Sequence, residues 1–336
     1  MKFSSFDISS LSDRVLAGQR LMAGFDGTCL NDDLKHLIRD LCAGGIILFS
    51  RNLDGPDEIR DLCRSAMDYA AECGLPPLFI AIDQEGGQVA RLKEPFTIFP
   101  GNPSIEDLQA AVRFAEITAC ELKYVGINMN FAPVLDVSGG TQNSIMAQRT
   151  FPGGPETVGR LGRAVIETLQ ANGILAVGKH FPGIGRTTFD SHVDQPVLET
   201  GPDDLERFDL PPFREAIAGG VSGIMLSHIR YTGVDKDVPA SMSRVIAHDL
   251  LRKKMGFNGL VMTDDLDMGA VTRHYRLENV IDAVDGAGID IVLVCHAGPA
   301  RQRAVDRFLE LLQSSDEHRE QAMRSVERIM RTKAAL

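Results

Sequence analysis

The residues best suited to chemistry lie in the stretch 178–192, which reads GKHFPGIGRTTFDSH. Asp190 and His192 are two positions apart, close enough for the carboxylate to hold the imidazole and fix its tautomer. A histidine oriented in this way is a general acid or base. The segment 181–200 shows neither helical nor strand periodicity, and loops of that length inside compact domains are usually functional or disordered. A chance Asp-x-His pair in a surface loop is the alternative.

Charged or imidazole side chains also follow several short apolar runs, each of which predicts a buried strand. These side chains are Asp83, Lys179, His180, His228 and Asp264, and Arg149 lies in the long segment after another such run. Simpler interpretations exist for each of them. Asp83 or Asp264 can cap a helix or form an ion pair, Arg149 can be an ion-pair partner, and a single histidine such as His228 is often a hydrogen-bonded core residue.

The elements that must position these side chains repeat one unit, a short apolar run followed by a helical pattern. The eight apolar runs are 20–25, 45–50, 78–83, 127–131, 174–178, 223–227, 259–263 and 290–294. Strand-then-helix repeats without amphipathic alternation favour a parallel β/α architecture. Eight units close a barrel, whose active site lies at the carboxyl ends of its strands. A doubly wound sheet is the competing fold, but the Gly-x-Gly-x-x-Gly turn after the first strand is absent.

We therefore expect one (β/α)8 TIM-like barrel over residues 1–336, in the α/β class. The segment 10–17 and a helix over 314–333 are polar enough to pack outside it as an N-terminal extension and a C-terminal helix. No linker rich in Pro, Gly or Ser divides the chain. Ser243 is expected to cap a helix that runs to about residue 254.

Composition excludes several classes of protein. The net charge of −11 argues against a nucleic-acid or anionic-membrane partner. The six cysteines include no Cys-x-x-Cys pair, which indicates reduced core residues instead of a disulfide frame or zinc site. There is no run of 18 apolar residues and no signal-peptide pattern at the start. These features predict a soluble cytoplasmic protein with no membrane partner.

Eight segments match a set of motifs in the order in which one enzyme family carries them. They are GGIILFSRN (44–52), AIDQEGGQVARL (81–92), NMNFAPVLDV (128–137), QRTFPGG (148–154), KHFPGIGRTTFDSH (179–192), MLSHIRY (225–231), PASMS (239–243) and GFNGLVMTDDLDM (256–268). In these motifs the chain resembles glycoside hydrolase family 3, and within it the single-domain bacterial β-N-acetylglucosaminidases that recycle cell-wall sugars.

The resemblance implies roles for individual residues. Asp264 matches the nucleophile that forms a covalent glycosyl-enzyme, and His192 matches the acid/base, held by Asp190. The residues expected to bind the hydroxyls of the terminal sugar are Asp83, Arg149, Lys179 and His180, to which we add Arg91 and His228 from the matched segments. Retaining hydrolysis needs a carboxylate and a proton donor on opposite sides of the bond, and the ordinary histidine pKa of about 6.5 suits the donor.

Two residues depart from the family pattern. The family commonly has a second histidine in KHFPGHG, where this chain has Ile184, and Arg186 follows two positions later. Because a guanidinium suits carboxylates, Arg186 is a candidate contact for an anionic aglycone such as a muramic acid or peptide carboxylate. A solvated position in the loop is the alternative.

The sequence thus predicts a retaining exo-β-N-acetylglucosaminidase that acts on muropeptide or chitin-derived oligosaccharides. We expect a monomer that uses neither a metal nor an organic cofactor. A β-N-acetylglucosaminide phosphorylase or another β-glycosidase of the same family is the nearest alternative. Two further alternatives are a non-catalytic sugar-binding barrel and a metal-dependent hydrolase with His180, His228, His296 and Asp264 as ligands; no known spacing supports the latter.

Overall fold

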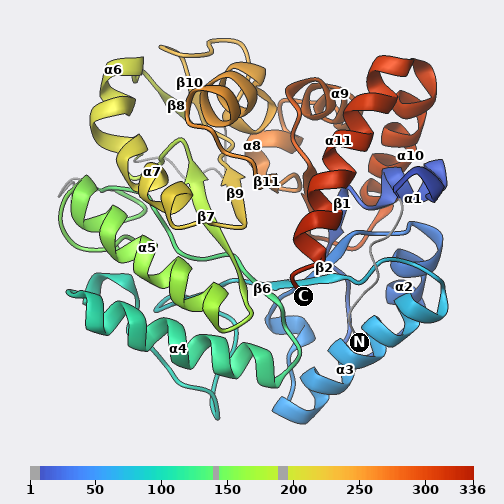
Figure 1. Cartoon of the computed structure of the whole chain (residues 1–336), viewed down its shortest axis with the longest axis horizontal. Coiled ribbons are helices and arrows are strands. Elements are labelled where there is room, and N and C mark those ends of the chain that lie inside the picture. The colour runs from blue at the N-terminus through green and yellow to red at the C-terminus, as the bar shows by residue number, and fades with distance from the viewer. Residues whose placement is uncertain (1–7, 139–143, 188–195) are drawn as a thin grey trace.

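The computed structural model describes residues 8–138, 144–187 and 196–336, and a closed barrel of parallel strands lies at its centre (Figure 1). The strands are β1 (Leu21–Ala23), β2 (Gly45–Leu48), β3 (Phe79–Ile82), β6 (Met129–Asn130), β7 (Leu175–Phe181), β9 (Gly223–Leu226), β11 (Leu260–Asp265) and β12 (Ile291–Val294). Around the barrel they follow the order β1-β12-β11-β9-β7-β6-β3-β2. The predicted (β/α)8 TIM-like fold is therefore confirmed.

The eight apolar runs form strands because both faces of each strand are covered. In β2, Ile46 belongs to the cluster shared with the helices, whereas Ile47 belongs to a separate inner cluster. Ile224 and Met225 of β9 divide in the same way. Alternate side chains of a strand point to opposite faces, so the inner cluster fills the barrel and the outer one binds the helices to it.

Helices surround the barrel (Figure 1). The longer ones are α3 (Pro56–Glu72), α4 (Leu108–Tyr124), α5 (Pro155–Ala171), α7 (Leu210–Ala218), α9 (Leu277–Ala287), α10 (Pro299–Ser314) and α11 (Asp316–Lys333). Shorter ones are α1 (Asp13–Gly18), α2 (Asp32–Lys35), α6 (Pro202–Asp204) and α8 (Gly269–Thr272), and the π-helical segments are η2 (His36–Asp40), η5 (Leu205–Asp209) and η7 (Val245–Lys254). The hydroxyl of Ser243 accepts the N–H of Ile246 at 3.1 Å, as the predicted cap of η7 requires.

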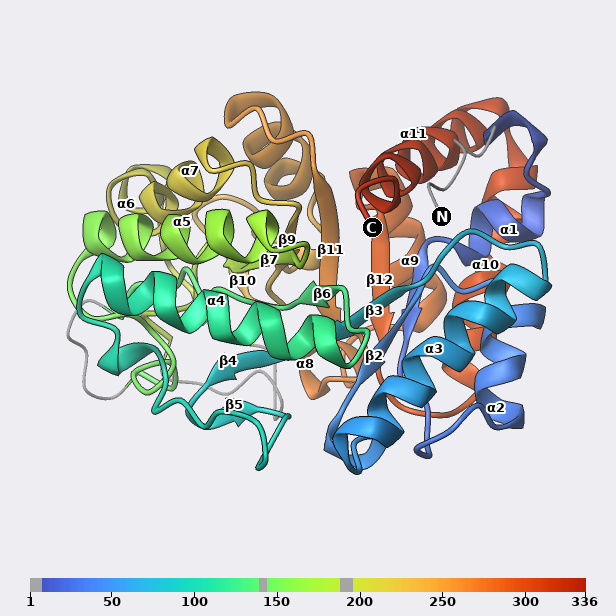
Figure 2. The same cartoon turned by 60° about the horizontal axis from the view of Figure 1, so that its bottom comes forward.

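The C-terminal helix α11 covers the amino end of the barrel. In Figure 2 it lies at the end opposite the strands β4 and β5. Lys333 is buried there and donates to Gln19 Oε1 at 2.7 Å, with its Nζ 4.9 Å from the centre of the Phe79 ring. Burial holds the pKa of Lys333 well below its usual value. On the outside, Leu16 of α1 packs with Leu312 of α10 and Val326 of α11.

Two small sheets lie outside the barrel. The strands β4 (Gln84–Gly86) and β5 (Val89–Ala90) form an antiparallel hairpin directly after β3. Gly86 and Gly87 have φ of 88° and 62°, values that favour glycine. The strands β8 (Val197–Leu198) and β10 (Arg230–Tyr231) pair in parallel. The sequence did not predict β8, because a strand of two residues shows no periodicity.

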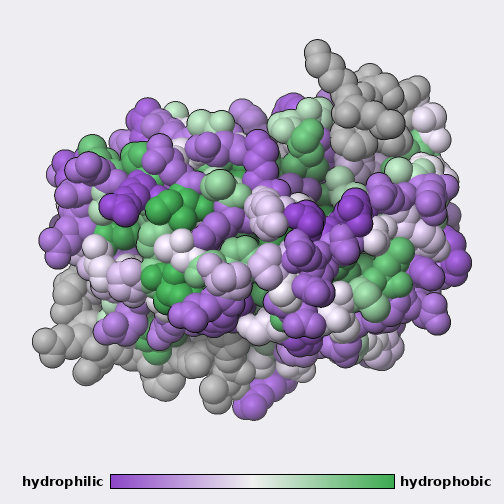
Figure 3. Space-filling model, turned by 90° about the horizontal axis from the view of Figure 1, so that it is seen from below, coloured by the Kyte–Doolittle hydropathy of each residue, from purple (hydrophilic) through white to green (hydrophobic). Residues whose placement is uncertain are grey.

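One face of the outer surface is mainly polar. Most of the face in Figure 3 is hydrophilic, with hydrophobic areas scattered across it. Within the described ranges, no helix combines the length and apolarity needed to cross a membrane. All six cysteines are free, as expected, but only Cys42, Cys63 and Cys295 are buried.

Candidate active site

A pocket of about 370 Å³ opens at the carboxyl ends of the barrel strands. Its polar lining includes six of the nine predicted site residues together with Asp265: Asp83, Arg91, Arg149, Lys179, His180, Asp264 and Asp265. Its apolar lining includes Phe49, Phe131, Ile145, Met146, Ile184 and Met268. The ends of β3, β7 and β11 therefore bring together residues that are up to 181 positions apart, from Asp83 to Asp264.

Lys179 is the centre of a buried ion-pair network on one wall of this pocket. Its Nζ lies 2.7 Å from Asp83 Oδ1 and 2.6 Å from Glu85 Oε1. Arg149 donates two hydrogen bonds to Glu85, of 3.0 and 2.7 Å, and Arg91 donates one to Asp83 at 3.1 Å. Three cations thus share two carboxylates, and this wall presents fixed N–H donors to the pocket.

The electrostatics of the network keep all its members charged. Burial alone would raise the pKa of Asp83, but Lys179 and Arg91 outweigh it and hold that pKa below its usual range. Burial likewise opposes ionisation of Glu85, and Lys179 and Arg149 hold its pKa low. Burial would lower the pKa of Lys179, yet Asp83 and Glu85 raise it. Charged partners in fixed geometry are suited to binding sugar hydroxyls.

His180 is held by a buried carboxylate that the sequence analysis did not identify as functional. Asp136 Oδ2 lies 2.8 Å from His180 Nδ1, and Asp136 Oδ1 accepts the N–H of Ile184 at 2.7 Å. Because Nδ1 is engaged, the second ring nitrogen of His180 remains for the pocket. Glu85 is the other residue that was missed. Both stand in motifs quoted from the sequence: Glu85 follows the predicted end of the third strand by two residues, and Asp136 lies five residues after the predicted end of the fourth.

Asp264 is the second-last residue of strand β11 and lines the pocket. Its Oδ1 accepts the N–H of Asp265 at 2.8 Å. Burial would raise the pKa of Asp264, but His180 and His228 outweigh that effect and lower it. An ionised carboxylate therefore faces the pocket, as a nucleophile requires.

His228 supports β11 and is not among the residues that line the pocket. Its Nδ1 lies 2.7 Å from Ser241 Oγ and its Nε2 lies 2.8 Å from the backbone oxygen of Asp265. Burial lowers the pKa of His228, although Asp264 acts in the opposite direction. With both ring nitrogens engaged, His228 positions the strand end that carries Asp264.

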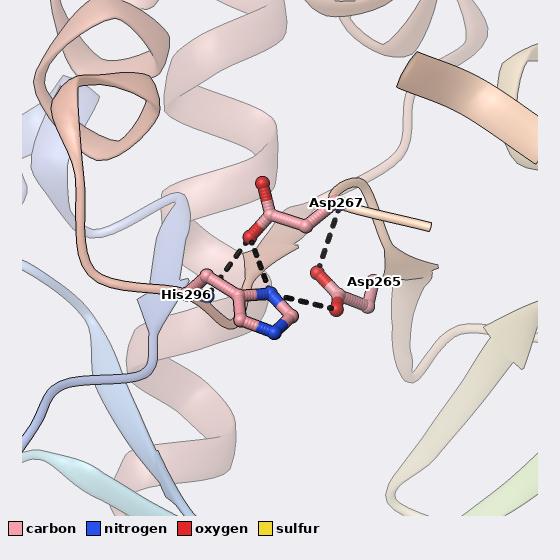
Figure 4. A group of neighbouring side chains, drawn as sticks. All are labelled: Asp265, Asp267 and His296. Carbon is pink, nitrogen blue, oxygen red and sulfur yellow. Dashed lines mark hydrogen bonds and ion pairs between the residues drawn. The ribbon is translucent and has the colours of Figure 1, made fainter. Parts of the chain in front are cut away.

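Asp265, Asp267 and His296 form a second group beside the pocket (Figure 4). Asp265 Oδ1 accepts the N–H groups of Asp267 and Cys295 at 3.0 and 3.1 Å, and burial raises the pKa of Asp265 to about 6. The His296 ring is 3.4 Å from Asp267 and its side chain is 70% exposed. Among the described residues this is the one group with metal-ligand geometry. It shares only His296 with the metal-ligand set considered from the sequence.

Arg186 is not among the residues that line the pocket, and its proposed contact with an anionic aglycone stays a prediction. Its guanidinium pairs with Asp209 of η5 at 2.5 Å and lies 5.6 Å from the Phe208 ring. Asp209 is 1% exposed, so Arg186 forms its ion pair with a buried carboxylate. Ile184, the other departure, does line the pocket. Asp190 and His192 lie outside the described residues, and their acid/base role stays a prediction.

Comparison with known proteins decides the family. The model of the glycosyl hydrolase family 3 N terminal domain matches residues 14–332. The chain belongs to glycosyl hydrolase family 3. It is therefore a glycoside hydrolase, as the motifs predicted.

Relatives within family 3 carry the name β-hexosaminidase. The protein from Thiobacillus denitrificans is 40% identical over 286 residues, covering 82% of this chain and 78% of its own. The protein from Pseudomonas aeruginosa is 35% identical over 308 residues, covering 90% of each chain.

Solved structures of family 3 enzymes share the fold. A β-N-acetylglucosaminidase from Paenibacillus sp. superposes with a TM-score of 0.93 at 38% identity over 97% of this chain, which spans 63% of that longer protein. NagZ from Neisseria gonorrhoeae, solved with N-trifluoroacetyl-D-glucosamine, gives a TM-score of 0.76 at 31% identity over 90% of this chain and 89% of its own.

Proposed function

We propose that this family 3 enzyme is an exo-β-N-acetylglucosaminidase that removes terminal N-acetylglucosamine with retention of configuration. The observation that carries the proposal is the ionised Asp264 in a pocket that the Lys179 network also lines. The names of the relatives, β-hexosaminidase and β-N-acetylglucosaminidase, support the acetamido sugar as the substrate.

The proposed reaction has two steps, both at the anomeric carbon. In the first, Asp264 forms a bond to this carbon while the glycosidic C–O bond breaks, and His192, oriented by Asp190, gives its proton to the leaving oxygen. In the second, His192 takes a proton from a water molecule, whose oxygen displaces Asp264 from the same carbon. The two inversions leave the sugar with its original β configuration.

The network wall supplies the proposed recognition of the terminal sugar. Lys179, Arg149 and Arg91 offer N–H donors to the hydroxyls, Asp83 offers acceptor oxygens, and the free nitrogen of His180 completes the ring of polar groups. The volume of about 370 Å³ is near the lower end of small-ligand pockets, about 300–1,000 Å³. That size suits one sugar unit and therefore an exo enzyme.

The natural substrate is proposed to be a muropeptide or a chitin-derived oligosaccharide. The monomeric state, the cytoplasmic location and the absence of a nucleic-acid or membrane partner stay predictions from the sequence.

The experiment compares release of 4-nitrophenol from its β-N-acetylglucosaminide and its β-glucoside, with the sugar product followed by proton NMR. We expect preferential cleavage of the acetamido sugar, with the β anomer formed first. Initial formation of the α anomer contradicts the retaining mechanism, and equal cleavage of both sugars contradicts the specificity. A sugar 1-phosphate in phosphate buffer would make the enzyme a phosphorylase.

A further inference from the structure

A second pocket, of about 440 Å³, lies between η7 and α11 and shares no lining residue with the catalytic pocket. Its lining is strongly basic and includes Arg244, His248, Arg252, His318, Arg324 and Arg328. Gly286, in the last turn of α9, and Gly288, in the turn from α9 to β12, also line it. This turn enters β12 at its amino end, so the pocket is remote from Asp264.

Most of the basic side chains come from two helices, η7 and α11, which both line the pocket. Arg244, His248 and Arg252 follow one another at intervals of four residues on η7, a spacing that puts them on one side of a helix. Arg324 and Arg328 have the same spacing on α11. Like charges that line one pocket repel each other, so this arrangement favours an anion among them.

The inner arginines are held in place by the protein. The two carboxylate oxygens of the buried Asp290 accept hydrogen bonds from Arg252 at 2.7 Å and from Arg328 at 2.9 Å. Arg244 donates to the backbone oxygen of Gly286 at 2.9 Å. These contacts fix the guanidinium groups before any ligand arrives, which lowers the entropy cost of binding.

The acidic groups nearby neutralise this lining only in part. Of the four arginines, Arg252 and Arg328 share the single carboxylate of Asp290, Arg324 lies 3.4 Å from Glu320, and Arg244 donates to a backbone oxygen. Asp285 is already bound by Arg20 at 2.5 Å and by His318 at 2.6 Å. Burial and the charge of Arg328 lower the pKa of Arg252 although Asp290 opposes them. A local excess of positive charge in a chain of net charge −11 indicates a place for a negative ligand.

We propose that this pocket binds a small molecule that carries a phosphate group or another multivalent oxyanion. Guanidinium forks match the oxygens of such groups, and the volume admits a molecule larger than the oxyanion alone. The site is independent of the glycosidase reaction. If the pocket binds no anion, the proposed glycosidase function is therefore unaffected.

The test is isothermal titration calorimetry with inorganic pyrophosphate at a constant ionic strength of about 0.15 M. The pocket variant is Arg244→Gln/Arg324→Gln, because both side chains are exposed and neither holds Asp290. The matched control is Arg303→Gln/Arg319→Gln, which removes the same charge from exposed ion pairs with Glu278 and Asp13 outside the pocket. Circular dichroism and urea unfolding confirm that both variants fold.

We expect saturable binding to the wild type, weakened at least about tenfold in the pocket variant and within about twofold in the control. Titrations with glucose 6-phosphate and with inorganic phosphate then separate the two ligand sources. Tighter binding of glucose 6-phosphate supports a phosphorylated small molecule, and tighter binding of inorganic phosphate supports a free inorganic ion. Absence of saturable binding to the wild type overturns the proposal. Equal weakening in the two double variants also overturns it, since the effect would then reflect net charge alone.

Discussion

Asp136 and His180 form a buried hydrogen-bonded pair, with 2.8 Å between Asp136 Oδ2 and His180 Nδ1. Asp136 follows β6 and His180 lies in β7, so the bond joins two neighbouring units of the barrel. The same carboxylate accepts the N–H of Ile184. The Asp136 side chain therefore fixes the tautomer of His180 and also holds the backbone at Ile184, just after β7.

Asp136→Asn is expected to lower kcat/KM by about 10- to 100-fold, because the amide no longer offers two acceptor oxygens and the imidazole loses its orientation. The measurement is hydrolysis of the 4-nitrophenyl β-N-acetylglucosaminide. Asp33→Asn serves as the control, since Asp33 pairs with Arg301 away from the pocket. Activity of Asp136→Asn within twofold of that control would contradict the role.

Asp264→Asn is expected to lower kcat by at least about three orders of magnitude while the fold is retained, because the amide is a poor nucleophile. Asp264→Gly should regain turnover with added azide and release the α-glycosyl azide, since azide fills the place of the carboxylate. Mass spectrometry and NMR of the product provide the check. Turnover of Asp264→Asn within about tenfold of the wild type rejects the nucleophile assignment.

The barrel and much of the polar lining followed from the sequence because both depend on local pattern. Apolar runs predicted the strands, and the rule that barrel sites lie at carboxyl ends placed Asp83, Lys179 and Asp264 together. Their pairing did not follow, because Lys179 reaches Asp83 and Glu85 through the register of β7 against its neighbours.

Tertiary placement also decided the contacts that the sequence analysis could not foresee. Arg186 stands in the loop motif, yet η5 brings the buried Asp209 against it. Asp136 is separated from His180 by 44 residues, and nothing in the local pattern pairs them. The α11 contact with the barrel interior through Ile329 is equally invisible from a polar helical sequence.

Lys179→Met is expected to destabilise the protein by about 3–5 kcal/mol, because it leaves Asp83 and Glu85 as buried carboxylates without their shared cation. Urea unfolding measures the change in the free energy of unfolding. Lys179→Met/Glu85→Gln should recover part of the loss, since one unpaired charge is removed. If the double variant loses more free energy of unfolding than the sum of the losses in the two single variants, Glu85 is not the carboxylate that the missing lysine destabilises.

Treatment with EDTA followed by dialysis is expected to leave the turnover of the wild type within about twofold. The proposed reaction uses Asp264 as the nucleophile and needs no Lewis acid. Asp265 and Asp267, the acidic members of the group in Figure 4, already accept backbone N–H groups. Two results together would instead make this group a catalytic metal site. One is a loss of activity after EDTA treatment that added zinc reverses, and the other is an inactive Asp267→Asn variant without any chelator.

Asp209 is expected to make the wild type less stable as the pH rises from about 5 to about 8. Burial raises its pKa from 3.8 to about 6, although Arg186 opposes the shift. A carboxyl whose pKa is higher in the folded state contributes stability below its unfolded pKa, and this contribution is lost as the pH rises through the folded pKa.

Over that pH interval the loss amounts to about 1–2 kcal/mol. Asp209→Asn cannot titrate, so its free energy of unfolding should gain about that much on the wild type between the two pH values. Urea unfolding at both values measures the difference. Asp33→Asn is the control, because the hydrogen bond from Arg301 outweighs burial and lowers the pKa of Asp33, so no gain is expected from it over this interval. A constant gap between Asp209→Asn and the wild type would mean that the ion pair with Arg186 keeps Asp209 charged throughout.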